Sequence, residues 1–196
     1  GMIMSTWLDR PLSAAGRIIV SENGKLVSKL VNLDRTTLVI PSVAIHMDRT
    51  ANGGHAWNIQ QDLLPLYGTA DDSLSFMDAV AAAAQVAPEN ILGHDLYLYS
   101  RIEGTLWGER HEFISSARLD DLQCAFAAFR GFTTGKKEKH ICVYALFDNE
   151  EVGSATNQGA GATFLKNTLT RISHSLGYSY DETQAMIARS FMISFS

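Results

Sequence analysis

The stretch from His140 to Ser154 constrains this chain most. Its first half, 141–147, is an apolar run rich in β-branched and aromatic residues, which predicts a buried strand. Three acids follow the run, and a glycine then breaks it: Asp148, Glu150, Glu151 and Gly153. Because ligands of open α/β sheets collect outside the carboxyl ends of strands, these acids are candidates for chemistry.

The adjacent pair Glu150 and Glu151 is typical of metal-assisted hydrolysis. In such sites one carboxylate binds the cation, while the other stays unligated and takes a proton from the metal-bound water. Neighbouring strand residues face opposite ways, so the backbone has to bend before both glutamates reach one site, and Gly153 permits such a bend. An isolated acidic triplet is more often a solvated loop, and these residues alone leave that interpretation open.

The first part of the chain is β-rich. Its Asn23-Gly24 dipeptide predicts a hairpin between the first two strands. An alanine-rich helix is predicted over 71–87, with Asp71 or Asp72 as its N-cap. The predicted strands, of which the last two are expected to pair with each other, are 16–20, 25–33, 37–40, 95–100 and 104–108.

The pattern changes after about residue 110 to alternating helix and strand. Apolar residues at helical spacing predict helices on both sides of the strand at 141–147, namely 118–132, 159–176 and 181–189. We therefore expect an α/β protein with a β-rich domain over 1–110 and part of an α/β domain over 111–196.

Charge and composition exclude some partners. The chain has 196 residues and a net charge of −5, which argues against a nucleic-acid partner because phosphate binding needs a basic face. No apolar run is long enough to span a membrane, and no signal peptide is evident. Cys124 and Cys142 fall in a predicted helix and a predicted strand, so we expect buried free thiols and a cytoplasmic protein.

Four stretches occur in a distinctive order: TWLDRPLSAAGR, IPSVAIHMDR, SARLDDLQCAFAAF, and LFDNEEVGS followed by QGAGATFL. Together they resemble the aspartyl aminopeptidase family, the zinc metallopeptidases that include aminopeptidase I. The resemblance covers nearly the whole chain but only the middle of a full-length family member. It implies part of a zinc-peptidase-like α/β catalytic domain, preceded by a β-rich dimerisation domain.

The resemblance also implies roles for individual acids. Asp120 corresponds to the carboxylate that bridges two zinc ions, Glu151 to a ligand of one of them, and Glu150 to the general base. Asp121 stands where the family often has asparagine, so either aspartate is a candidate for the bridge, and position favours Asp120. Without the resemblance, Asp120 is equally well explained as an acid that complements the dipole in the first turn of a helix.

His46 lies among apolar neighbours. A lone histidine in that setting is ordinarily half-buried and has a structural role. The resemblance implies instead that its segment reaches into the active site of a neighbouring subunit, where His46 donates a hydrogen bond to the developing oxyanion.

The resemblance implies a two-metal aminopeptidase that acts on peptide substrates with N-terminal, perhaps acidic, residues. Of the family's metal ligands only Asp120 and Glu151 are present, so we expect the chain to be inactive alone. We also expect a homo-oligomer, a dimer or larger. The alternative is a noncatalytic dimerisation or oligomerisation remnant of the family. A glycosidase acid pair is a poor third interpretation, because glycosidases hold their carboxyls about 5–9.5 Å apart across a sugar ring.

Overall fold

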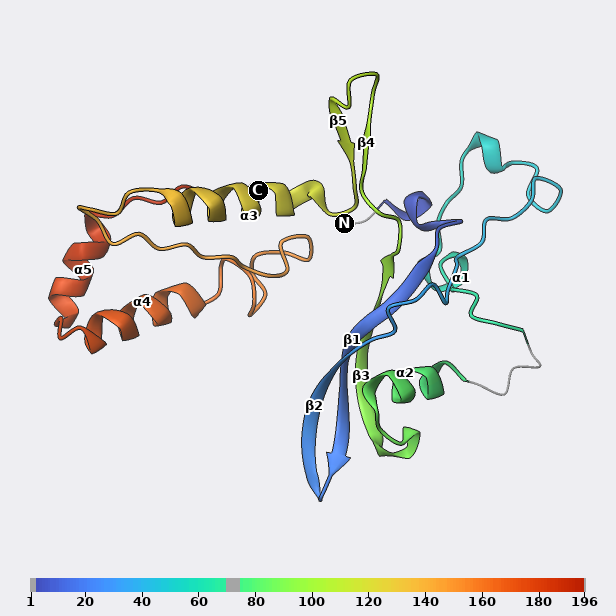
Figure 1. Ribbon diagram of the computed structural model, residues 1–196, viewed down its shortest axis with the longest axis horizontal. Coiled ribbons are helices and arrows are strands. Elements are labelled where there is room, and N and C mark those ends of the chain that lie inside the picture. Colours follow the sequence, from blue (N-terminus) through green and yellow to red (C-terminus); the bar gives the residue numbers. More distant parts are fainter. Residues whose placement is uncertain (1–2, 70–74, 196) are drawn as a thin grey trace. The chain divides into compact units, whose positions relative to one another are not determined.

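The computed structural model describes residues 3–69 and 75–195. It divides into two compact units, of which one ends at Ala117 and the other begins at Arg118. The elements of the first unit are β1 (Leu12–Glu22), β2 (Lys25–Asn32), α1 (Ile59–Asp62), α2 (Phe76–Ala84), β3 (Ile91–Ser100), β4 (Thr105–Trp107) and β5 (Phe113–Ser115). The second unit contains α3 (Leu119–Thr134), α4 (Phe164–Ser175) and α5 (Tyr180–Ala188) (Figure 1).

The sheet of the first unit has the order β2-β1-β3, and both pairings are antiparallel. The predicted hairpin between β1 and β2 is confirmed. Asn23 and Gly24 form its turn with φ angles of 51° and 73°. Left-handed conformations at both central residues characterise the tight turn whose twist matches that of paired strands.

The core of this unit lies between the three-stranded sheet and α2 (Figure 1). Leu12, Ile18 and Val20 are fully buried on one face of β1, and Val80 of α2 is 1% exposed. Ser75 caps α2 by accepting a hydrogen bond from the amide of Asp78, whose carboxylate in turn accepts one from the amide of Ser75. This capping box satisfies amides that the first turn of a helix leaves unpaired.

The N-cap residues predicted for α2, Asp71 and Asp72, lie outside the described residues. The cap of the helix is Ser75 instead.

The predicted pairing of 95–100 with 104–108 is wrong. β3 pairs with β1 along its length, which places the half-buried Leu96 and Leu98 against the core. β4 pairs with β5 in a separate hairpin, where the rings of Trp107 and Phe113 stack 4.6 Å apart. The run at 37–40 contributes isolated bridges rather than a strand.

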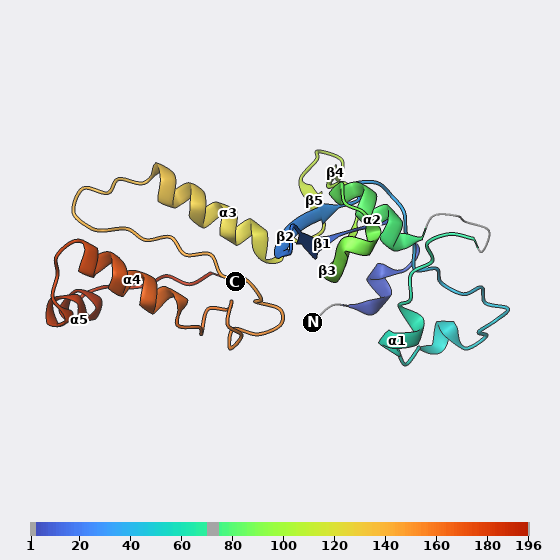
Figure 2. The same ribbon diagram turned by 90° about the horizontal axis from the view of Figure 1, so that it is seen from below.

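The predicted strand at 141–147 is also wrong for the described residues. This segment runs back along α3 without strand pairing, as both views show (Figures 1 and 2). Tyr144 anchors it by donating a hydrogen bond from its hydroxyl to the carbonyl of Ala125 at 2.9 Å. The physical reason is that a strand needs a hydrogen-bonded neighbour, and the described residues of this unit provide none.

The two units differ in how much apolar surface they bury. Among the described residues, every buried hydrophobic side chain lies between Leu12 and Ala81. Ile141 and Leu146 of the second unit are 74% and 61% exposed. Both cysteines are free, as predicted, but the prediction that they are buried is wrong, because Cys142 is exposed and Cys124 is half-buried in the sparsely packed second unit.

No helix within 3–69 and 75–195 is both long enough and apolar enough to cross a membrane.

The backbone of Gly16 in β1 lies close to that of Asp95 in β3. A Cβ atom at this position would be 2.0 Å from the backbone carbonyl oxygen of Asp95. We therefore expect Gly16→Ala to lower the free energy of unfolding by about 1–3 kcal/mol, because overpacking a rigid backbone contact costs this much. Urea denaturation followed by tryptophan fluorescence, to which the core-packed Trp7 contributes, measures the change.

The matched control is Gly93→Ala in β3, where an added Cβ has nothing within 4 Å. Equal denaturation midpoints for the two variants would contradict the close approach.

Candidate functional site

The predicted bridging residue Asp120 lies at the irregular start of α3. Arg118 precedes it in a left-handed conformation with φ of 61°, and Asp120 itself is extended, with φ of −79° and ψ of 118°. The peptide bond between Asp120 and Asp121 is cis. Asp120 is exposed and Asp121 is half-buried, so the two neighbouring carboxylates lie in different surroundings.

Glu150 and Glu151 lie in a turn that follows the extended segment, and both are exposed. Asn149 starts the turn with φ of 60°, and the amide of Gly153 closes it by donating to the carbonyl of Asn149 at 2.8 Å. Gly153 has φ of 130°, which favours glycine. The backbone therefore bends at the two glutamates, as a shared site for adjacent side chains requires.

The chain after the glutamates folds back and holds this turn. The amide of Asp148 donates to the carbonyl of Gln158 at 3.3 Å, and the amide of Gly161 donates to the carbonyl of Ser154 at 2.8 Å. Gly159 is buried, and an added Cβ would lie 2.5 Å from the carbonyl oxygen of Ser154. The small residues of QGAGAT thus pack against their own loop.

The side chain of Asn149 also links the two ends of this loop. Its amide nitrogen lies 3.4 Å from the hydroxyl of Thr156 and 3.3 Å from the side-chain oxygen of Gln158. Sequence reasoning did not single out these three residues. The signal that points to Asn149 is its place directly before the paired acids, since asparagine adopts left-handed conformations more readily than most residues.

His46 lies in the first unit, within a turn closed by a hydrogen bond from the amide of Met47 to the carbonyl of Ala44 at 2.8 Å. The side chain of His46 is exposed and is therefore not the half-buried histidine that its apolar neighbours suggest.

The donor chemistry of the predicted ligands suits zinc, because carboxylate oxygens bind it. The described residues nevertheless contain no group of three or more His, Cys, Asp or Glu side chains placed to hold a metal ion. Zinc sites take three or four protein ligands, so Asp120 and Glu151 do not by themselves complete one.

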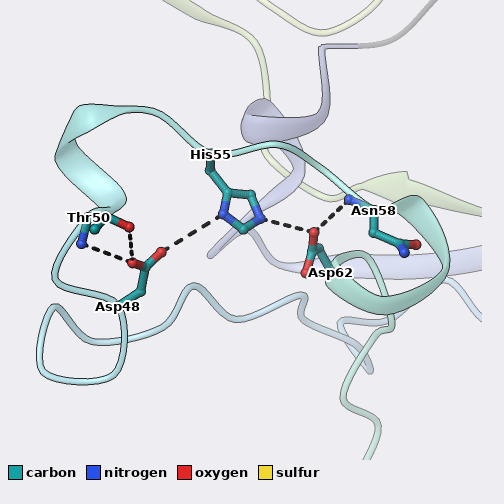
Figure 3. Close-up of polar contacts among 5 residues, drawn as sticks. All are labelled: Asp48, Thr50, His55, Asn58 and Asp62. Atoms are coloured by element: carbon teal, nitrogen blue, oxygen red, sulfur yellow. Dashed lines mark hydrogen bonds and ion pairs between the residues drawn. The ribbon is translucent and has the colours of Figure 1, made fainter.

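A polar cluster that the sequence did not reveal lies in the first unit (Figure 3). The ring of His55 lies between two carboxylates: Nε2 is 3.0 Å from Asp62 and Nδ1 is 3.9 Å from Asp48. Hydrogen bonds from the hydroxyl and the amide of Thr50 lower the pKa of Asp48. The amide of Asn58 and the ring of His55 lower that of Asp62 in the same way.

Comparison with known proteins assigns the chain to a protein family. Residues 1–196 match the family model described as aminopeptidase I zinc metalloprotease, M18. The chain belongs to the M18 family.

The names of individual relatives agree with this assignment to the M18 family. The probable M18 family aminopeptidase 2 of Clostridium acetobutylicum is 42% identical over 99% of the chain and 46% of its own length. Aspartyl aminopeptidase 4 of Saccharomyces cerevisiae is 32% identical over 99% of the chain and 48% of its own length. The chain thus spans about half the length of these relatives.

Solved M18 structures confirm the predicted mixed α/β fold class. The Chaetomium thermophilum mApe1 structure superposes with a TM-score of 0.75 and 30% identity, covering 92% of this chain and 45% of that one. The Ape4 chain of the Ape4 and Nbr1 complex superposes with a TM-score of 0.77 and 33% identity, covering 89% of this chain and 38% of its own length. A chain of the S. cerevisiae mApe1 dodecamer superposes with a TM-score of 0.66 and 27% identity, covering 89% of this chain and 41% of that one.

Gly159→Ala tests the loop that carries the paired glutamates of this M18 chain. The added Cβ would meet the carbonyl of Ser154, which accepts from the amide of Gly161. We expect the Gly161 amide to exchange with solvent roughly 5- to 150-fold faster, as an overpacking cost of about 1–3 kcal/mol implies. Amide exchange followed by NMR measures it. Gly131→Ala in α3, where an added Cβ meets nothing within 4 Å, is the control, and equal exchange in both variants would contradict the packing.

Proposed function

We propose that this chain is the central part of a zinc metalloaminopeptidase that removes N-terminal residues, acidic ones among them, from peptides. The observation that carries the proposal is the M18 family match over residues 1–196. An acidic preference is supported by the relative named aspartyl aminopeptidase 4. The free thiols of Cys124 and Cys142 fit a reducing compartment, and we place the protein in the cytoplasm.

In this proposal Asp120 and Glu151 supply carboxylate ligands to zinc. The greater exposure of Asp120 favours it over Asp121 as the bridging residue. The remaining ligands come from outside the described residues, since those residues hold no group of three candidate ligands. Zinc, when bound, would lower the pKa of a coordinated water to about 7.

Glu150 is the general base of the proposed reaction. Its carboxylate accepts a proton from the attacking water as the oxygen adds to the peptide carbonyl, a role that contributes about 10²–10⁴-fold to a rate. The turn closed between Asn149 and Gly153 supports this role, because it fixes the backbone on both sides of Glu150.

We assign to His46 a hydrogen bond to the developing oxyanion in the site of a neighbouring subunit. Two features support this role: the side chain is exposed, and it lies in a turn of the β-rich unit rather than in the unit with the acids. A preorganised donor at this position stabilises the transition state by about 3–4 kcal/mol.

The second candidate function is that of a noncatalytic oligomerisation module. It is favoured by the distribution of buried side chains, since the β-rich first unit contains every buried hydrophobic residue of the described chain.

A hybrid enzyme separates the two candidates. Residues 1–196 would replace the matching region of the Clostridium acetobutylicum relative, and hydrolysis of aspartyl and glutamyl chromogenic amides would be measured. We expect turnover by the hybrid, and a kcat about 10²–10⁴-fold lower in Glu150→Gln, because the base is lost. Zinc content by elemental analysis should be unchanged, since Glu150 is not a ligand.

The matched control is Glu138→Gln, an exposed glutamate in the lysine-rich loop, which should leave kcat unchanged. A folded hybrid without turnover, or one in which Glu150→Gln is as active as the parent, would favour the noncatalytic module. The chain by itself, incubated with zinc and desalted, is expected to retain less than one equivalent and to show no turnover.

We further propose that the β-rich unit, predicted over 1–110, mediates homodimerisation. Part of the sheet face away from α2 presents apolar side chains to solvent, around the exposed ion pair of Arg17 with Asp95. Leu26, Leu30 and Tyr97 are 74%, 86% and 70% exposed on it. The S. cerevisiae mApe1 dodecamer, a structural neighbour, supports self-association.

Leu30→Asp tests the dimer, because a charge in an apolar interface costs desolvation. We expect the variant to be monomeric at concentrations where the parent chain is dimeric or larger, as measured by light scattering during size-exclusion chromatography. Leu64→Asp, at another exposed leucine of the same unit, should leave the mass unchanged. A monomeric parent chain, or a Leu30→Asp variant of parental mass, would contradict the proposal.

A further inference from the structure

The segment from Asp48 to Asp62 is held by polar contacts rather than by a core. It lies mostly on the surface, and its apolar side chains contribute little burial: Ile59, for example, is 53% exposed. Where burial is slight, the conformation of a segment depends on its hydrogen bonds and ion pairs. In this segment those contacts converge on His55 (Figure 3).

Each carboxylate that faces His55 also accepts a hydrogen bond from a backbone amide of its own segment. Asp48 accepts hydrogen bonds from the amide and the hydroxyl of Thr50 at 3.0 and 2.7 Å. Asp62, the last residue of α1, accepts from the amide of Asn58 at 2.7 Å. The ring of His55 therefore lies between two carboxylates that are each bonded to backbone, and it packs against the ring of Trp57 in a T-shaped contact with centroids 4.7 Å apart.

The strength of this link depends on the charge of the ring. A neutral imidazole carries one N–H and donates towards one carboxylate, whereas an imidazolium donates from both nitrogens and attracts both. The pKa of Asp48 and that of Asp62 are lowered by their hydrogen bonds, so both carboxylates stay ionised at mildly acidic pH, where they can face a protonated ring. The full link is present while the ring of His55 carries a proton on both nitrogens, and it is weaker when the ring is neutral.

Asp48 is also where the cluster meets the turn of His46. The amide of Asp48 donates to the carbonyl of Ala44 at 3.4 Å, beside the 2.8 Å bond from the amide of Met47 to the same oxygen. The turn that these bonds close contains His46. A shift of Asp48 is therefore transmitted to the backbone of His46.

We propose that His55 is a positioning residue: in its protonated form it clamps Asp48 to Asp62 and so fixes the turn that presents His46, which makes that presentation pH-dependent. The inference rests on the proposed function only for the role of His46. The clamp itself is a property of this chain and is measurable without catalysis.

Amide hydrogen exchange of the intact chain tests the clamp. We would measure protection factors, which remove the intrinsic effect of pH on exchange, for Met47, Thr50 and Asn58 at about pH 5.5 and pH 8. An exposed ion pair of about 0.2–1 kcal/mol corresponds to a change of roughly 1.4- to 5-fold, so we expect protection to be higher at pH 5.5 by this factor. His55→Gln keeps a hydrogen-bond donor without a titratable charge and should abolish the difference.

Two further variants complete the test. Asp62→Asn keeps an oxygen that accepts from Asn58 but removes the charge, and it should also reduce the pH dependence. His174→Gln, on the exposed surface of α4 in the other unit, should leave it unchanged.

Three results would overturn the inference: equal protection at both pH values in the parent chain, a pH dependence that survives in His55→Gln, or a response at Thr50 and Asn58 without one at Met47. The last would limit the clamp to its own segment and remove the link to His46. An inactive hybrid enzyme together with an intact clamp would count against the proposed function alone.

Discussion

The first unit depends on the double pairing of β1. This strand is hydrogen-bonded to β2 on one edge and to β3 on the other, and its inner face provides the fully buried Leu12, Ile18 and Val20. The pairing with β3 brings the backbone of Gly16 so close to Asp95 that a side chain has no room. Because burial of apolar surface is the main stabilising contribution to folding, the position of α2 follows from the apolar face of the sheet that β1 centres.

Local signals in the sequence predicted the parts of this unit that depend on neighbouring residues. Asn23-Gly24 defined the hairpin, since its turn geometry is set by those two residues. The partner of β3 was not predictable in the same way, because a strand pattern shows which residues are buried and not which distant edge they pair with. The cap of α2 is Ser75 rather than an aspartate, and because serine and aspartate favour the N-cap position about equally, residue type alone does not distinguish them.

The candidate site was predictable in part. The adjacent Glu150 and Glu151 required a bend, and the turn from Asn149 to Gly153 provides one. The strand expected before them is absent from the described residues, since an apolar pattern specifies burial while a strand also needs a neighbour to pair with. The cluster around His55 left no periodic signal. Its members come from an irregular surface segment, where side-chain contacts follow from the path of the backbone.

The uneven burial of apolar side chains has a consequence for cooperativity. In a domain with one core, most amides become accessible only when the whole structure unfolds. The described residues of the second unit include no buried hydrophobic side chain. Its helices are therefore stabilised by local hydrogen bonds and by half-buried contacts, such as the hydrogen bond from Tyr144 to α3. Such segments open at low free energy. The helices after Ala117 should therefore become open to proteases and to hydrogen exchange before the sheet of the first unit does.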